Sequence, residues 1–190
     1  MPRLFSGIEI PAEARDRLAC LRAPLPGAKW VEHDNLHITL RFAGDIDNRR
    51  AAEFADALAA IQIDVFELRI IGLGAFGGND PRMIWAGIES SEALEQLARA
   101  HERAARQAGL QPETRPYKPH VTIARLRGSR VDAVARYLQH NGAFKLEPFV
   151  VERFVLYSSR PQVGGGPYVI EDAYPLRGGM LASSIDDDEH

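Results

Sequence analysis

The sequence has a single cysteine, Cys20, among its 190 residues. One cysteine excludes a disulfide framework and a metal cluster held by several thiolates. Long apolar stretches are also lacking, because no hydrophobic run approaches the roughly 18 residues that a membrane-spanning helix needs. The short apolar stretch near the N-terminus is interrupted by Glu9, which does not fit a signal peptide. We therefore expect a cytoplasmic protein with no membrane association.

A large excess of charge of one sign is lacking as well. The formal net charge is −3, with 45% hydrophobic and 26% charged residues, an ordinary globular composition. Residues 181–190 hold four acidic residues and no lysine or arginine, so the rest of the chain has 23 basic and 22 acidic residues. This balance excludes a polycationic coat for nucleic acid. We expect one two-lobed domain over residues 1–180 and a disordered acidic tail over residues 181–190.

One short pattern, His-apolar-Thr-apolar, occurs twice, 83 positions apart, although the chain has only six histidines. The first copy lies in NLHITLRF, residues 35–42, and the second in KPHVTIAR, residues 118–125. The second copy falls within residues 115–130, which carry five lysines and arginines and no acidic residue. Alternation in the first copy predicts a strand with two unlike faces. The expected core face carries Leu36, Ile38, Leu40 and Phe42, and the other face carries His37, Thr39 and Arg41.

The remaining sequence predicts strands and helices in a similar order in each half. Strands are expected near residues 3–10, 66–76, 82–89, 118–124, 147–159 and 167–176. Helices are expected near residues 11–21, 48–60, 90–108 and 131–140, with Asp47 and Ser90 or Ser91 as N-caps and Gly109 as a stop signal. The pattern predicts an α+β fold of two similar lobes with pseudo-two-fold symmetry. Their antiparallel sheets would face each other across a central cleft, with the helices outside.

The two motifs together supply paired imidazoles and paired hydroxyls. Residues two positions apart on a strand share a face, so His37 would lie beside Thr39, and His120 beside Thr122. Two imidazoles can serve as one proton donor and one proton acceptor near neutral pH. Threonine hydroxyls can bond the oxygens of a phosphate held between them. The set suits in-line displacement at phosphorus.

Arg125 and Phe42 occupy the same place, five positions after the histidine of their motif. Strict alternation would put Arg125 on the core face, where an unpaired guanidinium is rare. We therefore expect its strand to bend, bulge or end near Ala124, which would free Arg125 to reach a phosphate. Phe42 would stack on a base if its own strand bends likewise; the alternative is a plain core position.

These residues resemble the two-histidine phosphoesterase superfamily, and within it the RNA 2′,3′-cyclic phosphodiesterases, also called 2′-5′ RNA ligases. The similarity extends to about residue 177 and includes RLFSGIEIP, WVEHDNLHITLRFAGDI, FGGNDPRMIWAGIE, RPYKPHVTIARL and FVLYSSRPQVGGGPYVI. The resemblance implies catalysis without a metal or cofactor, with His37 as proton donor and His120 as proton acceptor. It also implies Arg125 as a phosphate ligand, alongside Thr39 and Thr122.

The implied reaction is hydrolysis of an RNA terminal 2′,3′-cyclic phosphate to a 2′-phosphate, with 2′-5′ ligation as its reverse. RNA ends or cyclic nucleotides are the expected partners of a monomeric protein. One alternative is a small cyclic phosphate of the nucleotide or ADP-ribose type as substrate. The other is an RNA-binding module whose histidines are only structural, although a core would more cheaply use valine or leucine there.

Other motifs have simpler interpretations. The spacing of His33 and His37 would suit two metal ligands on a helix, but His37 is predicted on a strand and no third ligand is near. Cys20 and Trp85 are expected in the core. The glycine-rich residues 163–168 precede a strand rather than a helix, so a hairpin or loop flanking the cleft is expected instead of a phosphate loop.

Overall fold

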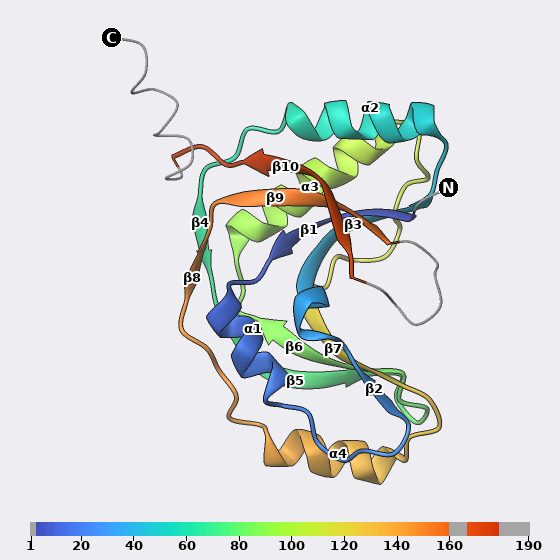
Figure 1. The fold of residues 1–190 in the computed structure, drawn as a ribbon, viewed down its shortest axis with the longest axis vertical. Coiled ribbons are helices and arrows are strands. Elements are labelled where there is room, and N and C mark those ends of the chain that lie inside the picture. The colour runs from blue at the N-terminus through green and yellow to red at the C-terminus, as the bar shows by residue number, and fades with distance from the viewer. Residues whose placement is uncertain (1–2, 160–166, 179–190) are drawn as a thin grey trace.

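A computed structural model describes residues 3–159 and 167–178 and confirms the α+β class (Figure 1). Its strands are β1 (Arg3–Glu9), β2 (Ala28–Trp30), β3 (His37–Asp45), β4 (Phe66–Leu68), β5 (Ile70–Phe76), β6 (Met83–Ile88), β7 (His120–Leu126), β8 (Phe149–Val151), β9 (Arg153–Ser159) and β10 (Val169–Pro175). Its helices are α1 (Ala12–Ala19), α2 (Asn48–Ala59), α3 (Glu92–Gln107) and α4 (Val131–His140), with a 3-10 turn η1 (His33–Asn35). The expected acidic tail 181–190 and residues 163–166 of the expected loop lie outside the described residues.

The main sheet has the strand order β10-β9-β1-β3-β7-β6-β5, and β2 adds to β7. Neighbouring strands run antiparallel, and β4 and β8 form a separate two-stranded ribbon. The two motif strands, β3 and β7, are joined through one residue pair, Ile38 opposite Val121. We call the strands from β10 to β3 the first lobe and those from β7 to β5, with β2, the second lobe. The two lobes therefore meet at the motifs themselves.

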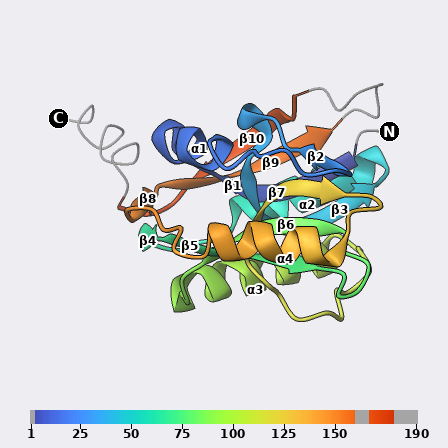
Figure 2. The same ribbon diagram turned by 90° about the horizontal axis from the view of Figure 1, so that it is seen from below.

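Each lobe has helices against one face of its strands. In the first lobe, buried His101 of α3 lies 2.7 Å from the Ser6 hydroxyl of β1 and 4.5 Å, centroid to centroid, from the Phe154 ring of β9. In the second lobe, the Tyr137 ring of α4 contacts the Trp30 ring of β2 at 5.6 Å. Figure 2 shows α4 running along β5 and β6, with α1 and α3 on opposite sides of the strands. The helices thus cover one face of β3 and β7, and the opposite face is available to the polar side chains of the motifs.

The helix boundaries follow the local signals in the sequence. The Asp47 carboxylate accepts a hydrogen bond from the Arg50 N–H at 2.8 Å, and the Ser91 hydroxyl accepts one from the Leu94 N–H at 3.1 Å. Gly109 follows α3 with a φ of +83°, a conformation that favours glycine and ends the helix. Cys20 is exposed at the end of α1, so its expected core position is wrong.

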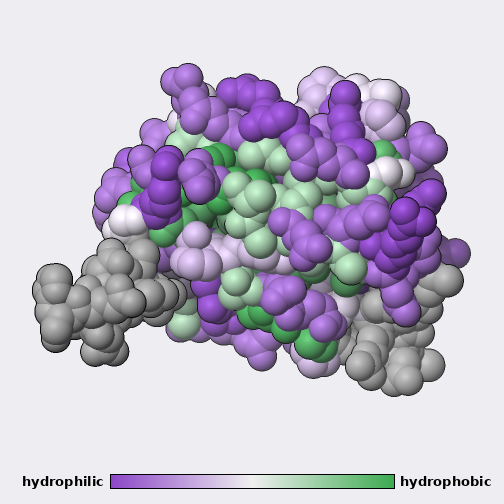
Figure 3. Space-filling view, turned by 90° about the horizontal axis from the view of Figure 1, so that it is seen from above, coloured by the Kyte–Doolittle hydropathy of each residue, from purple (hydrophilic) through white to green (hydrophobic). Residues whose placement is uncertain are grey.

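The face of the molecule that carries α2 mixes polar and apolar side chains (Figure 3). Seen from the side of α2, it is largely hydrophilic, with apolar side chains near its centre (Figure 3). A shallow groove between α2 and α3 has a volume of about 240 Å³ and includes Ala57, Ile61 and Ala100 in its lining. Over the described ranges, no helix combines the length and the apolar content needed to cross a bilayer.

The contact between β1 and β3 depends on a missing side chain. Gly7 lies opposite Thr39, and a Cβ at Gly7 would stand 2.6 Å from the Ile38 carbonyl oxygen, closer than real Cβ atoms approach backbone. The strand that carries the first motif therefore packs against bare backbone at this point.

Gly7→Ala should lower the free energy of unfolding by about 1–3 kcal/mol, because β1 and β3 must separate to admit the methyl group. Gly142→Ala is the matched control, since a Cβ there meets its nearest atoms at 3.5 Å, and its effect should stay within about 0.5 kcal/mol. Urea unfolding followed by circular dichroism measures both. Equal stability of the two variants would contradict the tight approach at Gly7.

Candidate active site

The pairing of Ile38 with Val121 brings the two motifs together. Each is the apolar residue between the histidine and the threonine of its motif, and each is 0% exposed. Because their side chains point into the core, the four flanking polar residues point to the other face. These are His37, Thr39, His120 and Thr122. An antiparallel pair has a local two-fold axis, which here relates each histidine to the other and each threonine to the other.

Both motif strands contain one extra residue directly after the threonine. In β3, Gly7 faces Thr39 and Ser6 faces Arg41, which leaves Leu40 as the extra residue. In β7, Trp85 faces Thr122 and Ile84 faces Ala124, which leaves Ile123 as the extra residue. Such bulges reverse the in-and-out alternation of the residues that follow. The predicted irregularity near Ala124 is therefore present, and β3 has its counterpart.

The bulges decide where three side chains point. Arg125 is exposed, as expected for a strand that bulges before it. Phe42 is 54% exposed, so the core position given by strict alternation is wrong. Arg41 was expected beside His37, but it turns to the helix side, where its Nε atom donates to Glu102 of α3 at 2.6 Å. The bulge at Leu40 accounts for both corrections.

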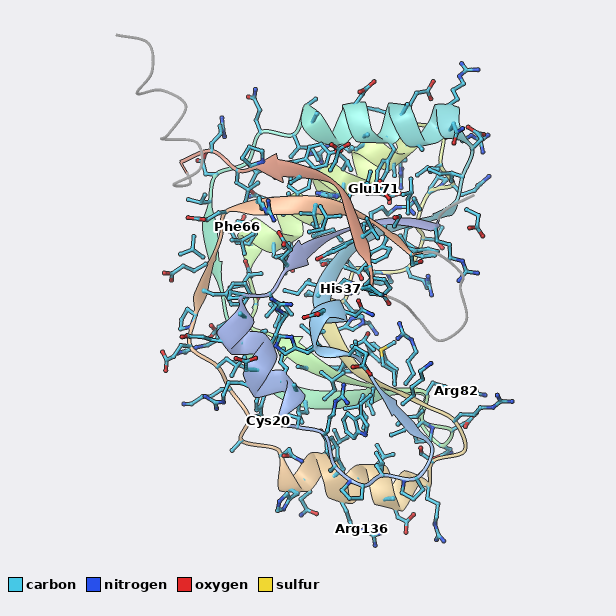
Figure 4. The ribbon with its side chains drawn as sticks, viewed as in Figure 1. Cys20, His37, Phe66, Arg82, Arg136 and Glu171 are labelled. Atoms are coloured by element: carbon cyan, nitrogen blue, oxygen red, sulfur yellow. The ribbon has the colours of Figure 1, made fainter. Side chains whose placement is uncertain are left out.

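His37 lies near the middle of the molecule, where the two lobes meet (Figure 4). Its Nδ1 atom is 2.7 Å from the Asn35 carbonyl oxygen. A carbonyl can only accept, so Nδ1 carries the hydrogen and Nε2 is the acceptor of the neutral ring. Nε2 lies 2.9 Å from the Thr39 hydroxyl, which donates to it in this state. The ring therefore presents Nε2 together with Thr39.

Aromatic side chains surround the His37 ring. Ring centroids of Phe5, Tyr157 and Tyr168 lie 5.1, 5.4 and 5.4 Å from that of His37. Burial lowers the pKa of His37 to about 4, and the hydrogen bond to the Asn35 carbonyl opposes this shift. The positive charges of Arg125 and His120 lower the pKa further, so both groups are close enough to repel a charged His37.

The second histidine repeats the arrangement with fewer aromatic neighbours. The Nδ1 atom of His120 donates to the Lys118 carbonyl oxygen at 2.6 Å, again two residues back, which leaves Nε2 as the acceptor of the neutral ring. The His120 ring is nearly perpendicular to the Phe76 ring, and the two ring centroids are 5.2 Å apart. Trp85 packs on Phe76 at 5.4 Å and faces Thr122 across the strands. Trp85 is half-buried on the motif face, so its expected core position is wrong.

The segment before His120 is fastened to the first motif strand. The Tyr117 hydroxyl donates to the Thr39 carbonyl oxygen at 2.7 Å, and Arg41 donates to the Gln111 carbonyl. Burial alone would raise the pKa of Glu102, but hydrogen bonds from the Glu113 N–H, Arg106 and Arg41 lower it, so the carboxylate stays charged and holds Arg41. These polar contacts thus tie the segment that leads to His120 to β3, the strand that carries His37.

His33 takes no part in this arrangement. Its Nε2 atom lies 2.7 Å from the Asp16 carboxylate and its Nδ1 atom 3.0 Å from that of Asp34. These hydrogen bonds, first to Asp34 and then to Asp16, raise its pKa. No cluster of metal-ligating side chains occurs within residues 3–159 and 167–178.

Sequence reasoning did not find the residues that support His37. The Asn35 side chain accepts a hydrogen bond from the Tyr168 N–H at 3.0 Å while its carbonyl binds His37. Phe5, Tyr157 and Tyr168 lie in strands, or next to one, that were predicted only as structure. One signal was available, because Tyr168 ends the glycine-rich loop expected to flank the site. The contact of Asn35 joins segments 133 residues apart, which no local pattern reveals.

Comparison with known proteins covers both motif strands. A model of the 2′-5′ RNA ligase superfamily matches residues 10–162. An Aeropyrum pernix protein named RNA 2′,3′-cyclic phosphodiesterase is 37% identical over 134 residues, 69% of this chain and 74% of that protein. A Thermotoga maritima protein of the same name is 26% identical over 186 residues, 94% of this chain and 98% of that protein. The crystal structure of E. coli LigT complexed with 3′-AMP superposes with a TM-score of 0.74 and 26% identity, over 93% of this chain and 99% of LigT.

The two histidines His33 and His37 should titrate in opposite directions from the usual value near 6.5. His37 should stay neutral well below that pH, with its hydrogen on Nδ1, because burial lowers its pKa to about 4. His33 should gain its proton above that pH because Asp34 and Asp16 raise its pKa. Proton–nitrogen NMR of the histidine rings over pH measures both in one sample. A His37 ring that titrates at or above the pH of His33 would refute this electrostatic description.

Proposed function

Because this chain belongs to the 2′-5′ RNA ligase superfamily, we propose that it hydrolyses the terminal 2′,3′-cyclic phosphate of RNA to a 2′-phosphate. The observation that carries the proposal is the pairing of Ile38 with Val121, which sets His37 and His120 on one face with both Nδ1 atoms occupied. Each ring thus keeps Nε2 for proton transfer. The relatives named RNA 2′,3′-cyclic phosphodiesterase support this choice of substrate.

The reaction needs one proton accepted and one donated. His120 takes a proton from water as the water oxygen bonds to phosphorus, and His37 gives its proton to the 3′-oxygen as that P–O bond breaks. The phosphate then remains on the 2′-oxygen, and exchange with solvent restores both rings. With an RNA 5′-hydroxyl in place of water as the nucleophile, the same groups form a 2′-5′ linkage, and the 3′-oxygen again leaves with the proton from His37.

The charge that develops on the phosphate oxygens needs donors that are already in place. Thr39 and Thr122 supply hydroxyls beside the two histidines, and Arg125 supplies a permanent charge on the same side of β7. Phe42, exposed on the first lobe, offers a flat apolar surface for the terminal base. These groups serve as acid, base and phosphate ligands, so the mechanism requires no metal or cofactor.

The donor role of His37 sets a condition on the complex. In the free protein, burial and the charges of Arg125 and His120 keep the pKa of His37 low, which favours the neutral ring. An anionic phosphate next to Nε2 offsets these positive charges and raises the pKa, so substrate binding and protonation of His37 favour each other. The donor is then charged when the substrate is present.

Two other functions use the same features. A small cyclic phosphate of the nucleotide or ADP-ribose type would meet the same reacting groups, and the names of the relatives favour RNA over it. A binding module with structural histidines fits less well, because both rings leave Nε2 beside a threonine or toward solvent rather than in the core. We further propose that the protein acts as a cytoplasmic monomer, since one chain supplies both motifs.

Replacing His37 or His120 with alanine should lower kcat/KM by roughly 10²–10⁴, the usual contribution of one general acid or base. The double variant should be far less than multiplicatively worse, because the two groups act as a unit. His140→Ala, at the end of α4, is the control and should keep full activity. The assay uses an oligonucleotide ending in a 2′,3′-cyclic phosphate, with phosphorus NMR to identify the product. Wild-type rates in a single variant, or a 3′-phosphate product, would contradict the mechanism.

The variants His37→Ala and His120→Ala also show which histidine is the proton donor and which is the proton acceptor. With a phosphodiester whose leaving group is p-nitrophenol, protonation of the leaving oxygen is no longer needed. The loss caused by His37→Ala should then shrink, while the loss caused by His120→Ala should persist. The reverse pattern would exchange the two roles.

Activity should survive prolonged dialysis against EDTA, because acid, base and phosphate ligands all come from side chains. A metal-dependent phosphodiesterase treated in parallel shows that the chelation is effective. Loss of activity that returns on adding Zn²⁺ or Mg²⁺ would instead point to a metal, with His33 and His37 as the first candidates for ligands.

A further inference from the structure

A lysine lies directly beside Arg125 on the neighbouring strand. In the register of β2 with β7, Lys29 is opposite Arg125, and in the register of β6 with β7, Met83 is opposite Arg125 on the other side. Side chains that are directly opposite on antiparallel strands share a face and lie about 4.5–5.5 Å apart at Cβ. Lys29 therefore stands next to the proposed phosphate ligand.

Two contacts identify the face that these residues share. The Thr122 hydroxyl donates to the Met83 sulfur at 3.4 Å, so Met83, and with it Arg125 and Lys29, is on the face of the motif hydroxyl. The next residue of β2, Trp30, contacts Tyr137 of α4 on the opposite face. Lys29 is exposed, so its ammonium group is available on the site side.

Arg127 extends the row. Its backbone N–H donates to the Gly27 carbonyl at 2.9 Å. Gly27 and Arg127 therefore continue the β2–β7 register, two residues along from the pair of Lys29 and Arg125. Alternation from Arg125 keeps Arg127 on the same face, and it is exposed. We call Lys29, Arg125 and Arg127 the basic row.

Among the described residues, the basic row has no acidic partner. In the described parts of the chain, no carboxylate lies within 4.0 Å of any of its three members, whereas Arg3 pairs with Asp45 at 3.6 Å and Arg153 with Glu9 at 2.6 Å in the first lobe. Arg82, at the β5–β6 turn, pairs with Asp80 at 2.6 Å and points away from His37 (Figure 4). Like charges placed side by side on a sheet are destabilising unless an anion joins them.

We propose that Lys29 and Arg127 form a second phosphate subsite, which holds the phosphodiester that links the terminal nucleotide to the rest of the RNA. This inference rests on the proposed function. A 2′,3′-cyclic phosphate is at the 3′ end of a strand, so every other phosphate lies on its 5′ side, and a cyclic mononucleotide has none. The subsite makes the enzyme prefer a chain end to a mononucleotide.

The division of chemistry between the lobes fits this placement. Exposed Phe42 and the aromatic residues around His37 belong to the first lobe, and the unpaired cations belong to the second. A terminal nucleotide with its cyclic phosphate between His37 and His120 then has an apolar surface on one side for its base. Its backbone continues over the cations on the other side.

The test compares kcat/KM for a 2′,3′-cyclic mononucleotide and for an oligonucleotide with a 2′,3′-cyclic phosphate end. Lys29→Ala and Arg127→Ala should each lower the ratio of oligonucleotide to mononucleotide kcat/KM about tenfold, the usual loss for one charge-assisted phosphate contact. Each should also reduce the slope of log kcat/KM against log salt for the oligonucleotide by about 0.7. Lys145→Ala, beside the outer strand β5, makes the same change of charge and should alter neither quantity.

Lys29→Met keeps the apolar stem of the side chain. It replaces Lys29→Ala if the alanine variant has a lower melting temperature than the wild-type protein. An unchanged ratio, or equal losses with both substrates, would overturn the second subsite. Turnover of the mononucleotide by the wild-type protein reports on the proposed function separately. If the wild-type protein hydrolyses neither substrate, the proposed function fails. If it hydrolyses both, and neither Lys29→Ala nor Arg127→Ala changes the ratio of oligonucleotide to mononucleotide kcat/KM, only the second phosphate subsite is refuted.

Discussion

One backbone pairing, between Ile38 and Val121, determines the relation of every polar group in the site. It places the core residue of one motif against the core residue of the other, so the histidines and threonines meet on the opposite face. A slip of one residue would turn one motif's polar side chains into the core and its apolar residues out. Burial of both apolar side chains opposes that slip, and the tight approach at Gly7 opposes movement of β3 from the other side. The register is thus held by packing rather than by the polar groups it serves.

The two halves of the site share a backbone but have different chemistry. Each motif strand has its bulge directly after the threonine. The side chains of Phe42 and Arg125 therefore turn away from the core at equivalent points of β3 and β7. One half provides the exposed Phe42 ring and a desolvated histidine, and the other provides a guanidinium with cationic neighbours. A symmetric backbone with unequal side chains suits a nucleotide, which is itself apolar at the base and anionic at the phosphate.

Much of the fold could be predicted because its signals are local. Alternation marked the motif strands, and Asp47, Ser91 and Gly109 marked helix ends through contacts within a few residues. The errors arose where distant segments decide the outcome. The bulge at Leu40 reflects its pairing with β1, which two-residue alternation within β3 cannot show. The strands predicted over residues 66–76 and 147–159 each divide because β4 and β8 leave the main sheet to pair with each other. The residues around His37 come from β1, from β9 and from the residue before β10, which meet only in the folded chain.

The buried contact between Ser6 and His101 makes one contribution to stability sensitive to acid. Burial lowers the pKa of His101 to about 3, and its Nε2 atom has no hydrogen-bond partner in the described residues. In the unfolded chain the ring titrates near 6.5, so between these values the unfolded state binds a proton that the folded state refuses. The contribution of His101 to stability is therefore fully present above about pH 6.5 and is lost as the pH drops toward the folded value. A helix that contacts the sheet through a neutral imidazole thus ties part of the fold's stability to pH, independently of the chemistry on RNA.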